Sequence, residues 1–377
     1  NVCVGDEAGT AITTGDNNVA VGYQSLDANT TGERNTSIGT SALSANTVGA
    51  RNVAVGHQAL LTNVNGSRSV AVGHNALSVQ NYSSATNGYN VAVGHESLAA
   101  STTGVENVAV GALAMSANTT GSYNTAVGGY GTLDANTTAN NNTAIGAGVL
   151  TVNTTGANNT SVGAYSLDAN TEGDDNVGVG YAALSSNTTA DNNTAIGRSA
   201  LGANTTGTPN TAVGYQALTT STTAVGNTAV GNQAGKDITT GGYNTLIGNL
   251  SGDDITTGTK NVAVGSVSLT NNTTGDNNTA AGYNALSSNT DANNNTALGY
   301  YALKAATTID YGFAIGYEAG VANTSGTQNT FVGNFSGDSV TTGGDNTMVG
   351  FQAGGAVTTG TQNTTYGHRS GDNITTG

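Results

Sequence analysis

The sequence predicts an all-β protein, a parallel β-solenoid (a β-roll) in which 22 coils of about 17 residues stack on one another. A glycine recurs with a period of 17 residues from Gly5 to Gly367. Val, Thr, Asn and Gly are abundant, which disfavours helices. Short runs of Val, Ile and Thr bounded by Gly and Asn are typical of strands and turns. We therefore expect each repeat to form one coil of two short strands and two turns, with neighbouring coils paired in parallel.

The repeat has the consensus N-T-A-V-G-Y-x-A-L-x-x-N-T-T-G-x-x, numbered here as positions one to seventeen. Position five is Gly in all 22 copies, and position one is Asn in 20. The spacing departs from 17 twice, which places insertions near residues 81–85 and 129–131 and predicts protrusions there. Residues 1–377 thus read as a single repeat array. The array begins at position one and stops two residues short of a repeat's end, so we expect a fragment of a longer fibre.

Two asparagine columns are predicted to be structural. In a solenoid each position stacks on its equivalent in the next coil, so an Asn column can form an amide ladder along the axis. Positions one and twelve both fit this pattern. Representatives of the position-one ladder are Asn18, Asn52, Asn124, Asn193, Asn261 and Asn329.

Positions nine and twelve vary together, which indicates a shared interior pocket. Position nine is Leu or Met in 15 copies, and position twelve is then polar or small. Where position nine is Gly, position twelve becomes Ile or Val, as in Gly235 with Ile238; only Gly320 with Asn323 breaks the rule. Close-packed interiors tolerate volume-conserving exchanges better than net losses. We expect Val or Ile at position four to form the facing wall of this pocket.

The strand at positions one to five is largely apolar on both faces, and such strands are usually buried on both. One face can line the interior of the coil, whereas the other needs a partner that a single thin coil does not offer. This predicts a homo-oligomer, most simply a trimeric rod.

The strand motif resembles a known family. N-V-A-V-G at residues 18–22 and N-T-A-I-G at residues 142–146 are similar to the head repeats of YadA-like trimeric autotransporter adhesins. The longer 17-residue form also resembles repeat shafts of phage tail fibres. The resemblance implies left-handed parallel β-rolls, three chains to a rod, on a cell or virion surface. The adhesin repeat is usually shorter, near 14 residues, so longer turns are expected here.

Composition and motifs argue against several other classes of protein. The net charge of −15 disfavours nucleic-acid binding. No apolar run is long enough to span a membrane in this segment. Cys3 is the one cysteine, expected to be a small buried residue, and it excludes an internal disulfide framework. No catalytic motif occurs, so we do not expect an enzyme.

Two groups of residues are candidate metal ligands. All four histidines, His57, His74, His95 and His368, fall at position six, so a histidine column could bind metal. The simpler interpretation is exposed turn residues interchangeable with tyrosine. The acidic loop Gly252-Asp253-Asp254 is a candidate for Ca²⁺, but the nonapeptide Ca²⁺-roll pattern is missing. No resident cofactor is expected.

Three functions remain open. The first is a structural fibre or adhesin segment, extracellular or on a cell or virion surface, that supports or presents elements binding a carbohydrate or cell-surface receptor. The alternative is a glycosylated extracellular fibril, because N-T-T sequons recur. The third, an ice-binding solenoid, is disfavoured because adjacent threonines on a strand point in opposite directions. The candidate glycosylation sites are Asn29, Asn118, Asn136, Asn153, Asn187, Asn204 and Asn272.

Overall fold

The structure is a computed structural model that describes residues 1–376, and these residues form strands, turns and bends but no helix. It divides into two compact units, Asn1–Asp191 and a second that begins at Asn192. The division falls inside one repeat of the predicted single array. Each unit is a parallel β-solenoid with eleven three-residue strands.

Each unit has one such strand per repeat, at positions two to four. The first unit contains β1 (Val2–Val4), β2 (Val19–Val21), β3 (Thr36–Ile38), β4 (Val53–Val55), β6 (Val70–Val72), β8 (Val91–Val93), β9 (Val108–Val110), β10 (Thr125–Val127), β11 (Thr143–Ile145), β12 (Thr160–Val162) and β13 (Val177–Val179). The second contains β14 (Thr194–Ile196), β15 (Thr211–Val213), β16 (Thr228–Val230), β17 (Thr245–Ile247), β18 (Val262–Val264), β19 (Thr279–Ala281), β20 (Thr296–Leu298), β21 (Phe313–Ile315), β22 (Thr330–Val332), β23 (Thr347–Val349) and β24 (Thr364–Tyr366).

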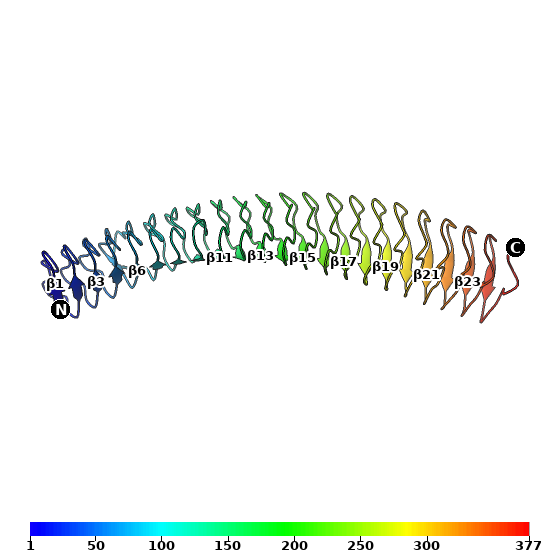
Figure 1. Ribbon diagram of the computed structural model, residues 1–377, viewed down its shortest axis with the longest axis horizontal. Coiled ribbons are helices and arrows are strands. Elements are labelled where there is room, and N and C mark those ends of the chain that lie inside the picture. Colours follow the sequence, from blue (N-terminus) through cyan, green and yellow to red (C-terminus); the bar gives the residue numbers. More distant parts are fainter. Residues whose placement is uncertain (377) are drawn as a thin grey trace. The chain divides into compact units, whose positions relative to one another are not determined.

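Successive strands pair in parallel with each repeat position opposite its equivalent, as with Ala54 and Ala71 between β4 and β6. The register survives both insertions, because Val70 pairs with Val91 and Thr125 with Thr143. Within each unit, Figure 1 shows the coils as flattened loops that carry their strands on one side. The predicted second strand per coil does not form. The rest of each coil is turns and bends, apart from the two-residue pair β5 (Gly66–Ser67) and β7 (Thr86–Asn87).

The strand turns its position-three side chain into the coil, and this corrects the predicted orientation. Ala20, Ala54 and their equivalents are fully buried, whereas positions two and four are half-buried or exposed in every strand. The wall of the interior pocket is therefore position three, and the Val or Ile at position four points outward. Cys3 also differs from expectation: it occupies the inward position but is exposed in the first coil.

Positions nine and twelve fill the interior together, as the sequence predicted. Leu218 and Ile238 are both fully buried, and both lie against the point where a side chain on Gly235 would begin. The exception at Gly320 has a physical cause: Phe331 from the next coil occupies the space that a leucine would fill. Asn323 can therefore remain at position twelve.

The backbone at position nine explains why that column holds only Leu, Met or Gly. Its φ is positive throughout, for example +52° at Leu26 and +58° at Gly235. A β-branched residue is strongly disfavoured there, whereas Leu tolerates the strain and Gly has none. At position five, φ is +133° at Gly265, and a methyl group there would lie 2.6 Å from the carbonyl oxygen of Gly282. Only glycine allows the coils to approach this closely.

Candidate functional site

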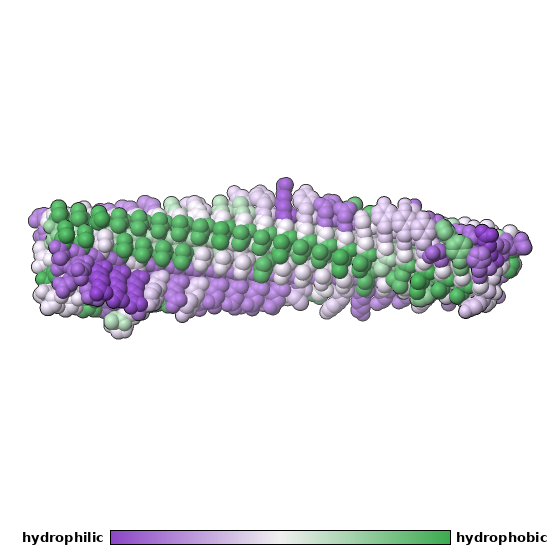
Figure 2. Space-filling view, turned by 90° about the horizontal axis from the view of Figure 1, so that it is seen from below, coloured by the Kyte–Doolittle hydropathy of each residue, from purple (hydrophilic) through white to green (hydrophobic). Residues whose placement is uncertain are grey.

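The outward side chains of the strands form a continuous apolar column in each unit, which we call the strand stripe. Its apolar part is position four, mostly Val or Ile. Position two beside it is Val in most coils of the first unit but Thr, which carries a hydroxyl, in most coils of the second. Figure 2 shows rows of apolar surface over the strands. Ile145 and Ile196 are among the members that are 40% exposed or more. Apolar surface that runs over many coils marks a place where another surface docks.

The position-one asparagines bind backbone more than one another. All six representatives, Asn18, Asn52, Asn124, Asn193, Asn261 and Asn329, are buried, with exposures of 0 or 1%. In the example of Asn18, Nδ2 donates to the carbonyl of Gly32 in its own coil at 2.9 Å. Its Oδ1 accepts the backbone N–H of Asn35 in the next coil at 2.8 Å. Each side chain therefore closes one coil and ties it to the next, which is a structural role.

The position-twelve asparagines form a true amide ladder. Nδ2 of Asn46 donates to Oδ1 of Asn29 at 2.7 Å, and Nδ2 of Asn170 donates to Oδ1 of Asn153 at 2.8 Å. The same Nδ2 atoms also donate to the position-fifteen carbonyl of their own coil, at 2.9 Å from Asn46 to Gly49. The ladder satisfies the buried Nδ2 donors but runs in segments, because Oδ1 of Asn46 and Oδ1 of Asn289 accept no hydrogen bond among the described residues.

This ladder contains all seven sequon asparagines, and their burial argues against the glycosylation hypothesis. Asn29, Asn118, Asn136, Asn153, Asn187, Asn204 and Asn272 are each 0% exposed and each donates a hydrogen bond through Nδ2. An N-linked sugar would need an open path from that atom to solvent. The packed coil offers none at these positions.

Position-thirteen threonines point their hydroxyls along the axis. The Oγ1 atoms of Thr30 and Thr171 donate to the position-thirteen carbonyl of the next coil, at 3.0 and 3.1 Å. These hydroxyls are engaged by backbone and are not presented as a regular array to solvent. The ice-binding hypothesis gains no support from them.

Position six forms exposed columns of stacked rings. In the first unit, His57, His74 and His95 stack with ring centroids 5.2 and 5.1 Å apart. In the second unit, Tyr300 stacks on both Tyr283 and Tyr317, at 5.5 and 5.1 Å. The fourth histidine, His368, stacks on Phe351 at 5.4 Å. Histidine and tyrosine are thus interchangeable in the stacking, as the sequence suggested.

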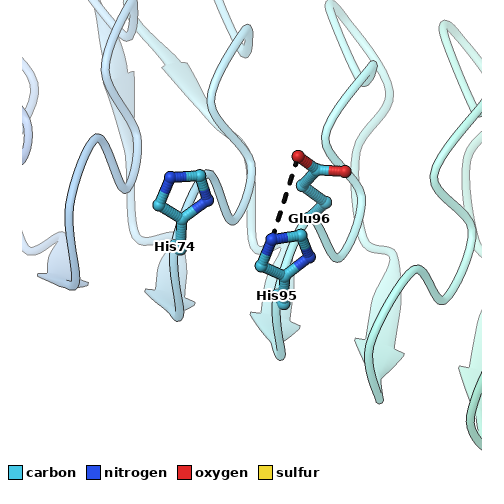
Figure 3. Close-up of side chains that lie close together, drawn as sticks. All are labelled: His74, His95 and Glu96. Carbon is cyan, nitrogen blue, oxygen red and sulfur yellow. Dashed lines mark ion pairs between the residues drawn. The ribbon is translucent and has the colours of Figure 1, made fainter.

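One of these columns also gathers metal-ligand atoms. His74, His95 and Glu96 each place a ligand atom within 4.8 Å of the others (Figure 3). Sequence reasoning found the histidines but missed Glu96, although its place directly after His95 could have indicated it. Asp253 and Asp254, the calcium candidates, belong to no such group among residues 1–376.

Position ten carries partly buried carboxylates, one in each of several separate coils. In Asp27, Asp168, Asp253 and Asp338, Oδ1 is buried and has no hydrogen-bond partner among the described residues. Burial raises the pKa of all four carboxyl groups. The pKa of Asp253 rises to about 6, first through burial and then through the repulsion of Asp254. These acids lie in coils far apart in the chain, so they do not form an acid–base pair.

The two insertions differ in character. In the first, Ser83, Ser84 and Ala85 are exposed but Tyr82 is buried, and its hydroxyl donates to the carbonyl of Gly104 at 2.9 Å. Burial raises the pKa of this hydroxyl to about 12. Tyr82 thus anchors the loop where Ser69 interrupts the position-one asparagines.

The second insertion protrudes and borders a hollow. Tyr130 is 77% exposed. It lies at the edge of an open cavity of about 450 Å³ whose other walls include Gly148, Thr151, Tyr165 and Asp168. The cavity therefore combines two tyrosines with a hydroxyl and a carboxylate, a mixture of apolar and polar groups typical of small-ligand sites.

Neither a protein-family model nor a curated protein matches this sequence significantly. The described residues contain no apolar helix of a length that would cross a bilayer.

Proposed function

We propose that this chain is a segment of a structural fibre, an adhesin head or tail-fibre shaft, that supports or presents surface-binding elements outside a cell or on a virion. The observation that carries the proposal is the strand stripe. The coils bury their own interior side chains, yet they leave Val and Ile facing outward in coil after coil. A solenoid that functioned alone would gain solubility from polar residues there.

The occupant of the strand stripe is, in this proposal, a second and third copy of the same chain. An identical chain carries a stripe of the same length and repeat, so two stripes match along their whole extent. Burying apolar side chains contributes about 25 cal/mol for each Å² removed from water. The number three and the left-handed coil come from the resemblance to adhesin heads, since the stripe itself requires only one further copy.

The oligomeric state tests this proposal. We expect light scattering after size exclusion to give three times the chain mass of 36.9 kDa. The double variant Val55→Lys/Val127→Lys, which places charges on the stripe, is expected to give the monomer mass with an unchanged circular dichroism spectrum. Thr31→Lys, on an exposed turn, is the matched control and should remain trimeric. A wild-type mass of one chain would overturn the proposed assembly.

A contact with carbohydrate is a second candidate, carried by the cavity beside Tyr130. Tyrosine rings can cover the apolar face of a sugar ring while Asp168 and Thr151 hydrogen-bond to its hydroxyls. Saturation-transfer NMR with a panel of neutral mono- and disaccharides would test this. Tyr130→Ala should abolish the signal and Tyr123→Ala, which removes an exposed ring that does not line the cavity, should not. Equal signals from both variants would rule out this contact.

A further inference from the structure

The stacked histidines lie beside the longest insertion in the repeat array. His57, His74 and His95 occupy position six in three consecutive repeats, and their ring planes are 8° apart in each pair. Backbone hydrogen bonds fix the column: the N–H of Asn75 donates to the carbonyl of His57 at 3.0 Å, and that of Glu96 to His74 at 2.9 Å. The insertion at residues 81–85 separates His74 from His95 in sequence, but the register of β6 and β8 brings their coils together.

Glu96 makes one end of this column different from the other. It lies at position seven with a φ of +53°, and its side chain turns back toward the imidazole of the preceding residue. Glu96 Oε1 lies 4.0 Å from Nε2 of His95, as the dashed line in Figure 3 marks. The residue after His57 is Gln58 and the residue after His74 is Asn75, so only the third histidine is followed by a carboxylate.

We propose that His74, His95 and Glu96 bind a divalent transition-metal ion of the Zn²⁺, Ni²⁺ or Cu²⁺ class. Two imidazoles and a carboxylate suit these ions, whereas Ca²⁺ and Mg²⁺ prefer oxygen ligands alone. The ligand atoms lie within 4.8 Å of one another, and a metal with bonds of about 2.0–2.2 Å would draw them closer. His74 and His95 are exposed and Glu96 is half-buried, so rotation of the side chains can supply that movement without moving the coils.

The ion would clip together the two coils that flank the insertion. His74 belongs to the coil that contains residues 81–85, and His95 belongs to the next one. This is also where Ser69 replaces the usual asparagine, so the coil lacks one position-one amide that would tie it to its neighbour. A metal ion held by the position-six histidines would compensate for that missing amide, because it would join the two ends of the segment between His74 and His95.

Calorimetric titration of the metal-free full chain with ZnCl₂ and NiCl₂ tests the site. We expect one ion per chain at this site, with binding weakened at least 10-fold in both His95→Gln and Glu96→Gln. His57→Gln is the matched control, because it removes a stacked ring but no proposed ligand, and it should bind as the wild type does. Hydrogen exchange at residues 79–90 should slow on metal addition in the wild type and in His57→Gln alone.

Three results would overturn the site: no binding of either ion at millimolar concentration, equal binding by the wild type and the His95→Gln variant, or a loss in His57→Gln as large as that in His95→Gln. The last result would mean that His57 contributes as much as His95, so that the histidine column as a whole and not the His74, His95 and Glu96 set holds the ion. The test does not depend on the oligomeric state, because each chain carries the complete ligand set.

Discussion

Phe331, like Leu246, fills interior space beside the position-nine glycines of two successive coils. Exchanging Phe331 for alanine while placing a leucine at Gly320 should show whether positions three and nine share one interior volume. Phe331 is fully buried and lies against both Gly320 and Gly337. Replacing a buried Phe with Ala costs about 3–5 kcal/mol of unfolding free energy. Gly320→Leu alone is also expected to destabilise, because its Cβ would lie 2.5 Å from Cδ2 of Phe331. Overpacking costs about 1–3 kcal/mol, and the positive φ of +60° adds about 1–2 kcal/mol.

The double variant Phe331→Ala/Gly320→Leu should be much more stable than the sum of the two single variants. It recreates an arrangement already present in this chain, where Leu218 precedes Ala229, Gly235 and Ile238. The single losses would sum to about 5–10 kcal/mol, whereas we expect the double variant to lie within about 2 kcal/mol of the wild type. The coupling energy is therefore about 3 kcal/mol or more in the favourable direction.

Hydrogen exchange followed by mass spectrometry is the suitable assay, because stacked repeats can open locally without unfolding as a whole. Opening free energies for residues 313–349 should fall in each single variant and recover in the double variant. Phe351→Ala, which removes a partly exposed ring, is the control and should cost about 1 kcal/mol or less. Simple additivity of the two single effects would refute the shared interior volume.

Three further substitutions test other columns. Gly265→Ala should lower the unfolding free energy measured in urea by about 3 kcal/mol, because φ is positive there and the new Cβ would meet the Gly282 carbonyl. Gly129→Ala is the control: no atom lies near its Cβ, so the unfolding free energy should change by less than about 0.5 kcal/mol. Asn170→Ala should cost about 2–4 kcal/mol, because it removes the two hydrogen bonds that Asn170 donates and the one that it accepts from Asn187. The exposed Asn271→Ala is the control and should be nearly neutral, and equal losses in the two variants would contradict the ladder. The raised pKa of Asp253, about 6 against 3.8, means that its protonated form favours folding, so its contribution to stability is full below pH 3.8 and is lost as pH rises through 6. Because the carboxyl is half exposed, Asp253→Asn should stabilise the fold by only about 1 kcal/mol at pH 8 and by almost nothing at pH 3.5. Denaturant titrations at the two pH values measure this difference, and an effect that does not depend on pH would contradict burial as its cause.

The sequence predicted the period, the parallel stacking and the pairing of positions nine and twelve, because each of these produces a residue pattern that recurs at fixed positions of the repeat. It did not reveal which strand face is inward. Val is larger than Ala, so the alternation suggested that position four was the core, whereas the thin coil has room only for Ala opposite Leu.

A signal in the sequence could have corrected this. Leu246, Phe331 and Met348, the large residues at position three, occur only in coils whose position nine is Gly. Such compensation requires positions three and nine to share one space, which places position three inside. The single strand per coil could not be predicted in the same way, since it depends on positive φ at positions seven, nine and seventeen, which ordinary residues such as Gln24, Leu26 and Arg34 adopt here.

The candidate sites were harder to predict than the fold. The histidine column was visible in the spacing, but the contribution of Glu96 depends on how a left-handed residue directs its side chain back over its neighbour. The cavity beside Tyr130 arises from an insertion that leaves the strand register intact. The residue pattern of the repeat therefore gives no sign of it.

Distances between spin labels one or more coils apart test the stacking most directly. In a Cys3→Ala background, cysteines that replace Tyr215 and Tyr283 lie at position six, four coils apart, and the pair at Tyr215 and Tyr317 lies six coils apart. With about 4.8 Å per coil, pulsed electron resonance should give about 19 Å and about 29 Å, measured with excess unlabelled chain to suppress signals between chains. Distances that fail to grow by about 4.8 Å for each 17 residues would contradict a solenoid of stacked repeats.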